Sequence, residues 1–176
     1  MKTIPIVGFT AWSGTGKTTL IEALVANLTA QGVRVAVIKH DAHRFEIDRE
    51  GKDSWRFTQA GAAISIVSSA EKTALIESRP MGLDQLTNLV HDVDYVLVEG
   101  YKTGGLTQIG VSRAATGKGL PAPLSRYAAV VTDEALPGAQ IPVFGLEDVP
   151  GVARFLLDHG AEFTQIPYRA WTSTEE

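Results

Sequence analysis

Apolar runs and amphipathic segments alternate along this chain, and their order predicts a strand–helix–strand opening. Residues 4–10 and 33–39 are apolar and rich in β-branched side chains, as buried strands are. Between them, apolar residues recur at helical spacing over 17–31, and Gly32 stands where a helix would end. Two strands joined by such a helix pair in parallel through a right-handed crossover. We therefore expect a βαβ unit at the start of the chain.

The same alternation continues beyond this unit. The expected helices are 54–60, 83–91 and 148–159, and the expected strands are 63–68, 73–77, 95–98, 108–112, 128–132 and 142–144. Ser54 or Asp53 would cap the first of these helices. A polar turn between two neighbouring strands predicts an antiparallel hairpin at 63–77. The pattern indicates a three-layer α/β fold with a predominantly parallel central sheet and an antiparallel hairpin addition. We expect one domain over 1–170 and a flexible tail at 171–176.

Composition and charge exclude several classes of protein that could have such a fold. The 176 residues include no cysteine, which excludes disulfides, thiolate metal sites and cysteine nucleophiles. A net charge of −4 gives no electrostatic reason to bind nucleic acid or a membrane surface. No apolar run approaches the roughly 20 residues that a membrane-spanning helix needs. We expect a cytoplasmic protein that binds neither nucleic acid nor membrane.

A glycine-rich turn separates the first predicted strand from the first helix. Its residues, the end of the phosphate-loop (Walker A) pattern, are Ser13-Gly14-Thr15-Gly16-Lys17-Thr18-Thr19. Ala11 stands at the position of the pattern's first glycine. Backbone N–H groups and the helix N-terminus of such a loop bind the phosphates of a nucleotide. We expect Lys17 to reach the β and γ oxygens, Thr18 to ligate Mg²⁺ and Thr19 to bond a phosphate. A turn without a ligand is the alternative, but an exposed Lys-Thr-Thr adds nothing to helix stability.

Two acidic residues flank the apolar run 95–98. Glu99 follows the run, at the carboxyl end of a buried strand, where open α/β sheets bind ligands. It could hold Mg²⁺ directly or through water, so Lys17 and Glu99 are the candidate catalytic pair, and Thr18 and Glu99 the candidate metal ligands. The alternative is a solvated acid that opens a loop. Asp94 precedes the run, and we expect it to be structural.

The charged segment 39–54 begins at the carboxyl end of the second predicted strand, on the same rim as the phosphate loop. Lys39, His40, Asp48 and Lys52 are the candidates for contact with phosphates, Mg²⁺-bound water or a second substrate. A metal pair of His40 and His43 is a weaker hypothesis. The balanced charges of the segment would also suit a solvated loop.

Asp133 ends the predicted strand 128–132 on this rim. A carboxylate there could accept from the two guanine donors, N1–H and N2–H₂, whereas adenine offers an acceptor. The alternative is an aspartate that only starts the turn before Pro137 and Gly138. No Gln or Arg is attached to a recognisable catalytic motif, so we expect slow hydrolysis.

Taken together, these motifs resemble the molybdopterin-guanine dinucleotide biosynthesis protein B (MobB) family. The resemblance extends to about residue 150 and rests on the phosphate loop with Ala11 and on the segments 38–40, 51–54, 60–62 and 96–102. It implies a phosphate-loop NTPase fold and a GTP-binding, Mg²⁺-dependent homodimer with at most weak GTPase activity. Such a protein assists a separate nucleotidyltransferase in attaching GMP to molybdopterin. By resemblance, Asp133 matches the family's guanine-reading aspartate.

Two other functions fit the same motifs. One is an ATP-dependent carboxylate-activating ligase similar to dethiobiotin synthetase, a class that also pairs a phosphate loop with a Val-Glu-Gly strand end. The other is a regulatory switch whose segment 41–56 becomes ordered when a triphosphate binds. Base preference separates the adapter from the ligase, and a ligand-dependent change in the segment would favour the switch.

Overall fold

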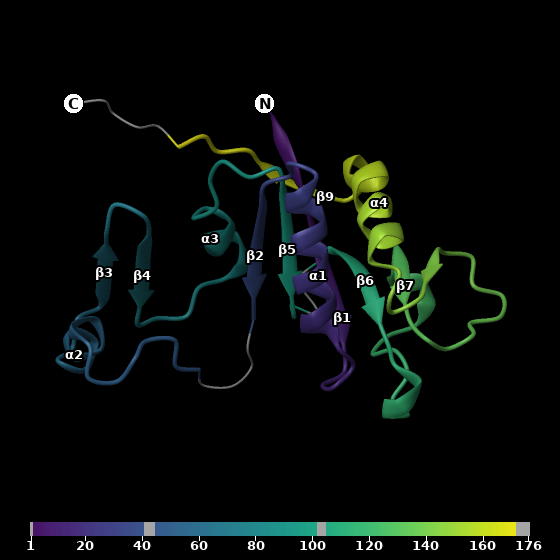
Figure 1. The fold of residues 1–176 in the computed structure, drawn as a ribbon, viewed down its shortest axis with the longest axis horizontal. Coiled ribbons are helices and arrows are strands. Elements are labelled where there is room, and N and C mark those ends of the chain that lie inside the picture. Colours follow the sequence, from purple (N-terminus) through teal and green to yellow (C-terminus); the bar gives the residue numbers. More distant parts are fainter. Residues whose placement is uncertain (1, 41–44, 102–104, 172–176) are drawn as a thin grey trace. The chain divides into compact units, whose positions relative to one another are not determined.

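Strand β1 (Thr3–Ala11) lies inside the main sheet and pairs along both of its sides (Figure 1). The structure is a computed structural model that describes residues 2–40, 45–101 and 105–171. The strands of the main sheet lie in the order β2 (Val35–Lys39), β5 (Tyr95–Glu99), β1, β6 (Thr107–Val111), β7 (Ala129–Val131) and β8 (Val143–Phe144). Each neighbouring pair in this order is parallel, so the carboxyl ends of these strands meet along one edge.

Two helices, α1 (Lys17–Ala30) and α4 (Val149–His159), pack against each other and against the main sheet. Phe9 of β1, Leu24 of α1 and Leu156 of α4 are fully buried members of one apolar cluster. At β6, Leu120 and Tyr127 approach the open side of Gly110 and thus cover part of the sheet. Within the described ranges, no helix combines the length and the apolar character that crossing a membrane would require.

The first half of β1 has an antiparallel neighbour, β9 (Thr164–Pro167), with Ile4 opposite Ile166. The sequence patterns did not indicate this strand, because its four residues form no apolar run and end in proline. Three short 3₁₀ helices were not predicted either: η1 (Ala114–Thr116), η2 (Leu124–Arg126) and η3 (Gly160–Glu162).

Residues 45–85 form a compact unit that is distinct from the unit formed by the other described residues. It contains α2 (Asp53–Gln59) and a hairpin of β3 (Ile64–Ser68) and β4 (Thr73–Glu77), whose antiparallel register places Ile66 opposite Leu75. Helix α3 (Leu83–Thr87) begins in this unit. The predicted hairpin addition and parallel sheet are confirmed, whereas the single domain over 1–170 stays a prediction.

Two local predictions were wrong. Neither Ser54 nor Asp53 caps α2: Lys52 is the N-cap residue, no side chain caps the helix, and the Ser54 hydroxyl donates to Asp48 Oδ1 at 3.0 Å. The helix expected over 83–91 ends at Thr87. The amides of Leu89 and Val90 bond carbonyls three residues earlier, which tightens the chain into turns.

Of the predicted flexible tail, only Trp171 lies within the described residues. Its amide donates to Asp92 Oδ2 at 2.7 Å. This prediction otherwise concerns residues outside the described ranges.

Candidate nucleotide-binding site

The phosphate loop connects the carboxyl end of β1 to the start of α1. Gly14 and Gly16 adopt positive φ angles of 85° and 89°, which side chains would oppose, and Gly16 is the N-cap residue of α1. Thr15 is buried, and its hydroxyl donates to the Trp12 carbonyl at 3.0 Å, which braces the loop from inside. No side chain caps the N-terminus of α1, so its first N–H groups can serve an anion.

Glu99 lies at the carboxyl end of β5, between the phosphate loop and the end of β2. The parallel register places it beside Phe9 of β1 and Lys39 of β2. The apolar strand therefore ends in an acid that is only 7% exposed. This acid lies at the edge of the sheet where the phosphate loop begins.

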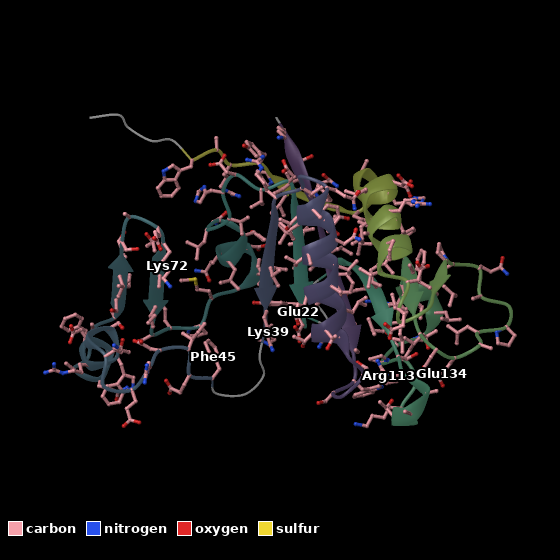
Figure 2. The ribbon with its side chains drawn as sticks, viewed as in Figure 1. Glu22, Lys39, Phe45, Lys72, Arg113 and Glu134 are labelled. Carbon is pink, nitrogen blue, oxygen red and sulfur yellow. The ribbon has the colours of Figure 1, made fainter. Side chains whose placement is uncertain are left out.

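A single oxygen of Glu99, Oε1, has three polar neighbours. The Thr18 hydroxyl donates to it at 3.0 Å, and the Nζ atoms of Lys17 and Lys39 lie 3.3 and 3.9 Å away. Figure 2 shows Lys39 at the end of β2. The structure thus brings together four residues that the sequence singled out separately. Two ammonium groups offset the charge of this buried carboxylate, as burial requires.

Gly100 and His40 hold the ends of β5 and β2 together. The His40 amide donates to the Glu99 carbonyl at 2.8 Å. Gly100 has a φ angle of 97°, and a Cβ atom at this position would lie 2.9 Å from the His40 carbonyl oxygen. Glycine is therefore required for the close approach that sets Glu99 beside Lys39. The His40 ring lies 4.6 Å from that of Tyr101.

The Mg²⁺ hypothesis fits the donors at this edge. The hydroxyl of Thr18 and the carboxylate of Glu99 are hard oxygen ligands and already lie within hydrogen-bond distance of each other. Among the described residues, no group of three or more His, Asp or Glu side chains could hold a metal ion. The pair of one hydroxyl and one carboxylate suits Mg²⁺, which commonly takes one or two protein ligands and completes its shell with phosphates and water. The partner proposed for His40 in a metal pair, His43, lies outside the described residues.

Arg113 is a residue of this edge that no sequence motif contains. It lies two residues beyond the end of β6, and its Nε–H donates to the Thr15 carbonyl at 3.2 Å. Figure 2 shows it beyond the carboxyl end of β6. The register of β6 against β1, with Val111 beside Ala11, brings the arginine to the phosphate loop. An arginine therefore accompanies the loop, although the sequence shows none in a catalytic motif.

Asp133 lies in the turn after β7, and one of its oxygens is used within the protein. Oδ1 accepts from the Ala114 amide at 2.7 Å, so the carboxylate ties the turn after β7 to the turn after β6. Hydroxyls of Ser112 and Thr132 bond each other at 2.8 Å and strengthen the same connection. Oδ2 takes no part in this bond, and the role of Asp133 in reading guanine stays a prediction.

Asp48 and Lys52 organise the start of α2 in the other unit. Asp48 Oδ1 accepts from the Arg49 amide at 2.8 Å and from the Ser54 hydroxyl, while the Lys52 carbonyl accepts the first helical bond, from Arg56. Both residues are therefore part of a turn that begins a helix. Their contact with a nucleotide or second substrate stays a prediction.

The family model for "Molybdopterin guanine dinucleotide synthesis protein B", MobB, matches residues 6–133, a span that contains the phosphate loop, Glu99 and Asp133. This chain belongs to the MobB family. Among curated proteins it is similar to the molybdopterin-guanine dinucleotide biosynthesis adapter proteins of Haemophilus influenzae and Escherichia coli. The first is 37% identical over 87% of this chain and 88% of the relative, and the second is 34% identical over 88% and 93%.

A solved MobB structure supports the same placement. The crystal structure of Bacillus subtilis MobB superposes with a TM-score of 0.73 and 26% identity, covering 88% of this chain and 97% of that one. The predominantly parallel sheet with its helices is therefore the fold of the MobB family. The family resemblance inferred from the sequence motifs is confirmed.

Proposed function

We propose that this protein is an adapter in molybdopterin-guanine dinucleotide biosynthesis that binds GTP with Mg²⁺. The curated relatives carry the adapter name and align with most of this chain. The observation that carries the nucleotide part is the convergence of Lys17, Thr18 and Lys39 on Glu99, beside the open N-terminus of α1. Such an edge offers cations, N–H donors and a metal-ligating acid to one triphosphate.

Binding of the triphosphate would exchange the partners of Glu99. Lys17 would leave Glu99 Oε1 for the β and γ oxygens, and the loop N–H groups would bond the same phosphates. Thr18 and Glu99 would then hold Mg²⁺, which neutralises phosphate charge when bound. Lys39 is 54% exposed along its side chain and would stay beside Glu99 as the remaining cation. Glu99 would thus keep a cation beside it with and without ligand.

The homodimer and the cytoplasmic location are parts of the proposal. A two-stranded hairpin is marginal by itself in water, and β3 and β4 expose Ile64, Ile66, Val67 and Leu75 by 46 to 61%. A second copy of the chain would cover apolar surface of this kind. The other proposed partners are molybdopterin, or the molybdenum cofactor, and the nucleotidyltransferase that attaches GMP to it.

Nucleotide titration separates the adapter from the carboxylate-activating ligase. We expect GTP to bind with Mg²⁺ and to outcompete ATP, and GMP to bind weakly because it lacks the β and γ phosphates. Preference for ATP would favour the carboxylate-activating ligase. Isolated protein should hydrolyse GTP well below the roughly 1–100 s⁻¹ of kinases. Rapid turnover without a partner would contradict the adapter role.

The adapter role itself requires a reconstituted reaction. A purified nucleotidyltransferase would convert molybdopterin to its guanine dinucleotide with and without this protein. We expect more guanine dinucleotide to form when this protein is present, and a smaller increase with the Lys17→Ala variant. Arg154→Met, an exposed substitution on α4, is the matched control. No gain with the unaltered protein would contradict the proposal.

A further inference from the structure

Arg113 bonds the peptide that connects Thr15 to Gly16, at the turn of the phosphate loop. Its Nε–H donates to the Thr15 carbonyl at 3.2 Å, and its Nη2 lies 3.2 Å from the position that a Cβ atom on Gly16 would occupy. The guanidinium therefore lies against the backbone of the loop. It is neither part of the phosphate-loop motif nor adjacent to it in sequence.

The direction of this bond has a consequence for the next N–H group. In a trans peptide the C=O and the N–H point in opposite directions, and the described residues contain no cis peptide. The Thr15 carbonyl points at Arg113, so the Gly16 N–H points away from it. Gly16 has a φ angle of 89° and little steric resistance to rotation of this peptide. A bond to the carbonyl is thus a means of holding the N–H in one direction.

Both neighbours of Arg113 are anchored to the end of β7, which keeps the arginine in place. The Ser112 amide donates to the Val131 carbonyl at 3.1 Å, and its buried hydroxyl bonds Thr132 at 2.8 Å and Glu134 Oε2 at 3.2 Å. On the other side, the Ala114 amide donates to Asp133. Figure 2 shows Arg113 and Glu134 at this end of the sheet. The arginine therefore extends from a fixed backbone.

We propose that Arg113 is a positioning residue of the nucleotide site, which holds the Thr15–Gly16 peptide so that the Gly16 N–H faces the bound phosphates. The proposal rests on the proposed binding of a nucleoside triphosphate. Arg113 acts on the loop and not on the base. Loss of the arginine side chain therefore lowers the affinities for GTP and ATP by the same factor and leaves the ratio of the two affinities unchanged.

The test measures dissociation constants for GTP and ATP, with Mg²⁺, on three variants of Arg113. Arg113→Met removes the donor and the charge at similar length, and we expect affinity for both nucleotides to fall about tenfold, the usual effect of one charged hydrogen bond. Arg113→Lys keeps a donor and the charge and should recover most of the loss. Arg113→Ala repeats the test without a long side chain. Arg154→Met is the control arginine, and Lys17→Ala shows that the assay detects a damaged site.

The outcomes separate this inference from the proposed function. If the unaltered protein binds no triphosphate, the proposed function fails. If it binds and Arg113→Met and Arg113→Ala bind equally well, only the positioning role is overturned. A change in the ratio of GTP affinity to ATP affinity would show that Arg113 contacts the base, and it would overturn the positioning role as well. So would equal losses in the lysine and methionine variants. The unfolding temperature without nucleotide should not change, and a matching drop would show a structural role instead.

Discussion

Strand β5 has a carboxylate at each end, and the two are bonded in different ways. Asp94, just before the strand, accepts three hydrogen bonds from Arg34: from Nε at 2.9 Å, from Nη2 at 2.8 Å and from the amide at 3.1 Å. Both of its oxygens are used, and the Arg34 guanidinium lowers the pKa of this carboxyl to about 2. Glu99, at the other end, uses a single oxygen for three contacts. That oxygen accepts a hydrogen bond from Thr18 and forms ion pairs with Lys17 and Lys39.

The difference shows which acid can exchange its partners. A two-pronged arginine pair fixes the geometry of a carboxylate and leaves it little capacity for a ligand. Lysines are flexible point charges, and Lys17 can pair with Glu99 or with a phosphate. Asp94 therefore joins β5 to the start of β2, whereas Glu99 has the bonding of an acid in a ligand site.

Lys17→Ala tests the exchangeable end and should have the largest effect. The variant loses the cation that would move from Glu99 to the phosphates, so GTP affinity should fall by about 30-fold or more, the usual cost of truncating one partner of a close charge pair. Calorimetric titration with Mg²⁺ measures this. The fold should stay intact, because Lys17 lies on the rim and Lys39 and Thr18 remain beside Glu99. Unchanged GTP affinity would refute the phosphate-loop assignment.

Glu99→Gln keeps the shape of the acid and removes its charge. Thr18 can still bond the side chain, but Mg²⁺ loses an anionic ligand. We expect the gain in GTP affinity on adding Mg²⁺ to shrink by roughly tenfold, while affinity without metal changes less. Titration of GTP at several Mg²⁺ concentrations measures both. The control is Glu22→Gln on α1, an exposed acid (Figure 2). An unaltered Mg²⁺ response would leave Glu99 with a structural role, like Asp94.

The positions of the two acids were predictable from sequence, because one apolar run places them at opposite ends of a strand. The phosphate loop and Lys39 follow from the same rule, since the carboxyl ends of parallel strands share an edge. Arg113 could not be found this way. Its contact with Thr15 depends on the register of β6 against β1, which joins residues almost 100 positions apart.

Other differences have similar physical causes. The pattern over 83–91 suits a helix, but turns replace its second half after Thr87. Strand β9 takes its conformation from pairing with β1 and not from its own composition. The bond between Asp133 and Ala114 joins two turns that are separate in sequence. For β9 and for Asp133, contacts between residues distant in sequence decide what local preference leaves open.

Asp133 is a third acid, and two variants show which of the other two it resembles. Asp133→Asn keeps an oxygen for the Ala114 amide but cannot accept from both guanine donors. It should reduce the preference for GTP over ATP by about tenfold, because one charged hydrogen bond is lost. Asp133→Ala also removes the acceptor of the Ala114 amide, so it should in addition lower the affinity for both GTP and ATP. Competition binding measures the ratios. If the asparagine variant keeps its GTP preference, Asp133 is a structural acid and guanine is read elsewhere.

The smallest effect is expected at the other end of β5, where Asp94→Asn removes the charged partner of Arg34. The pKa of Asp94 is lowered from 3.8 to about 2, so its charge stabilises the fold above pH 4, and this contribution disappears as the pH falls through 2. Both side chains are more than one-third exposed, and solvent screening limits the effect to about 1 kcal/mol or less. Urea unfolding at pH 6 and pH 3 measures the difference between variant and parent, which should narrow at the lower pH. The exposed Asp158→Asn on α4 is the control. GTP affinity should not change in Asp94→Asn. A loss of binding in this variant would contradict the assignment of a structural role to Asp94 and a ligand-binding role to Glu99.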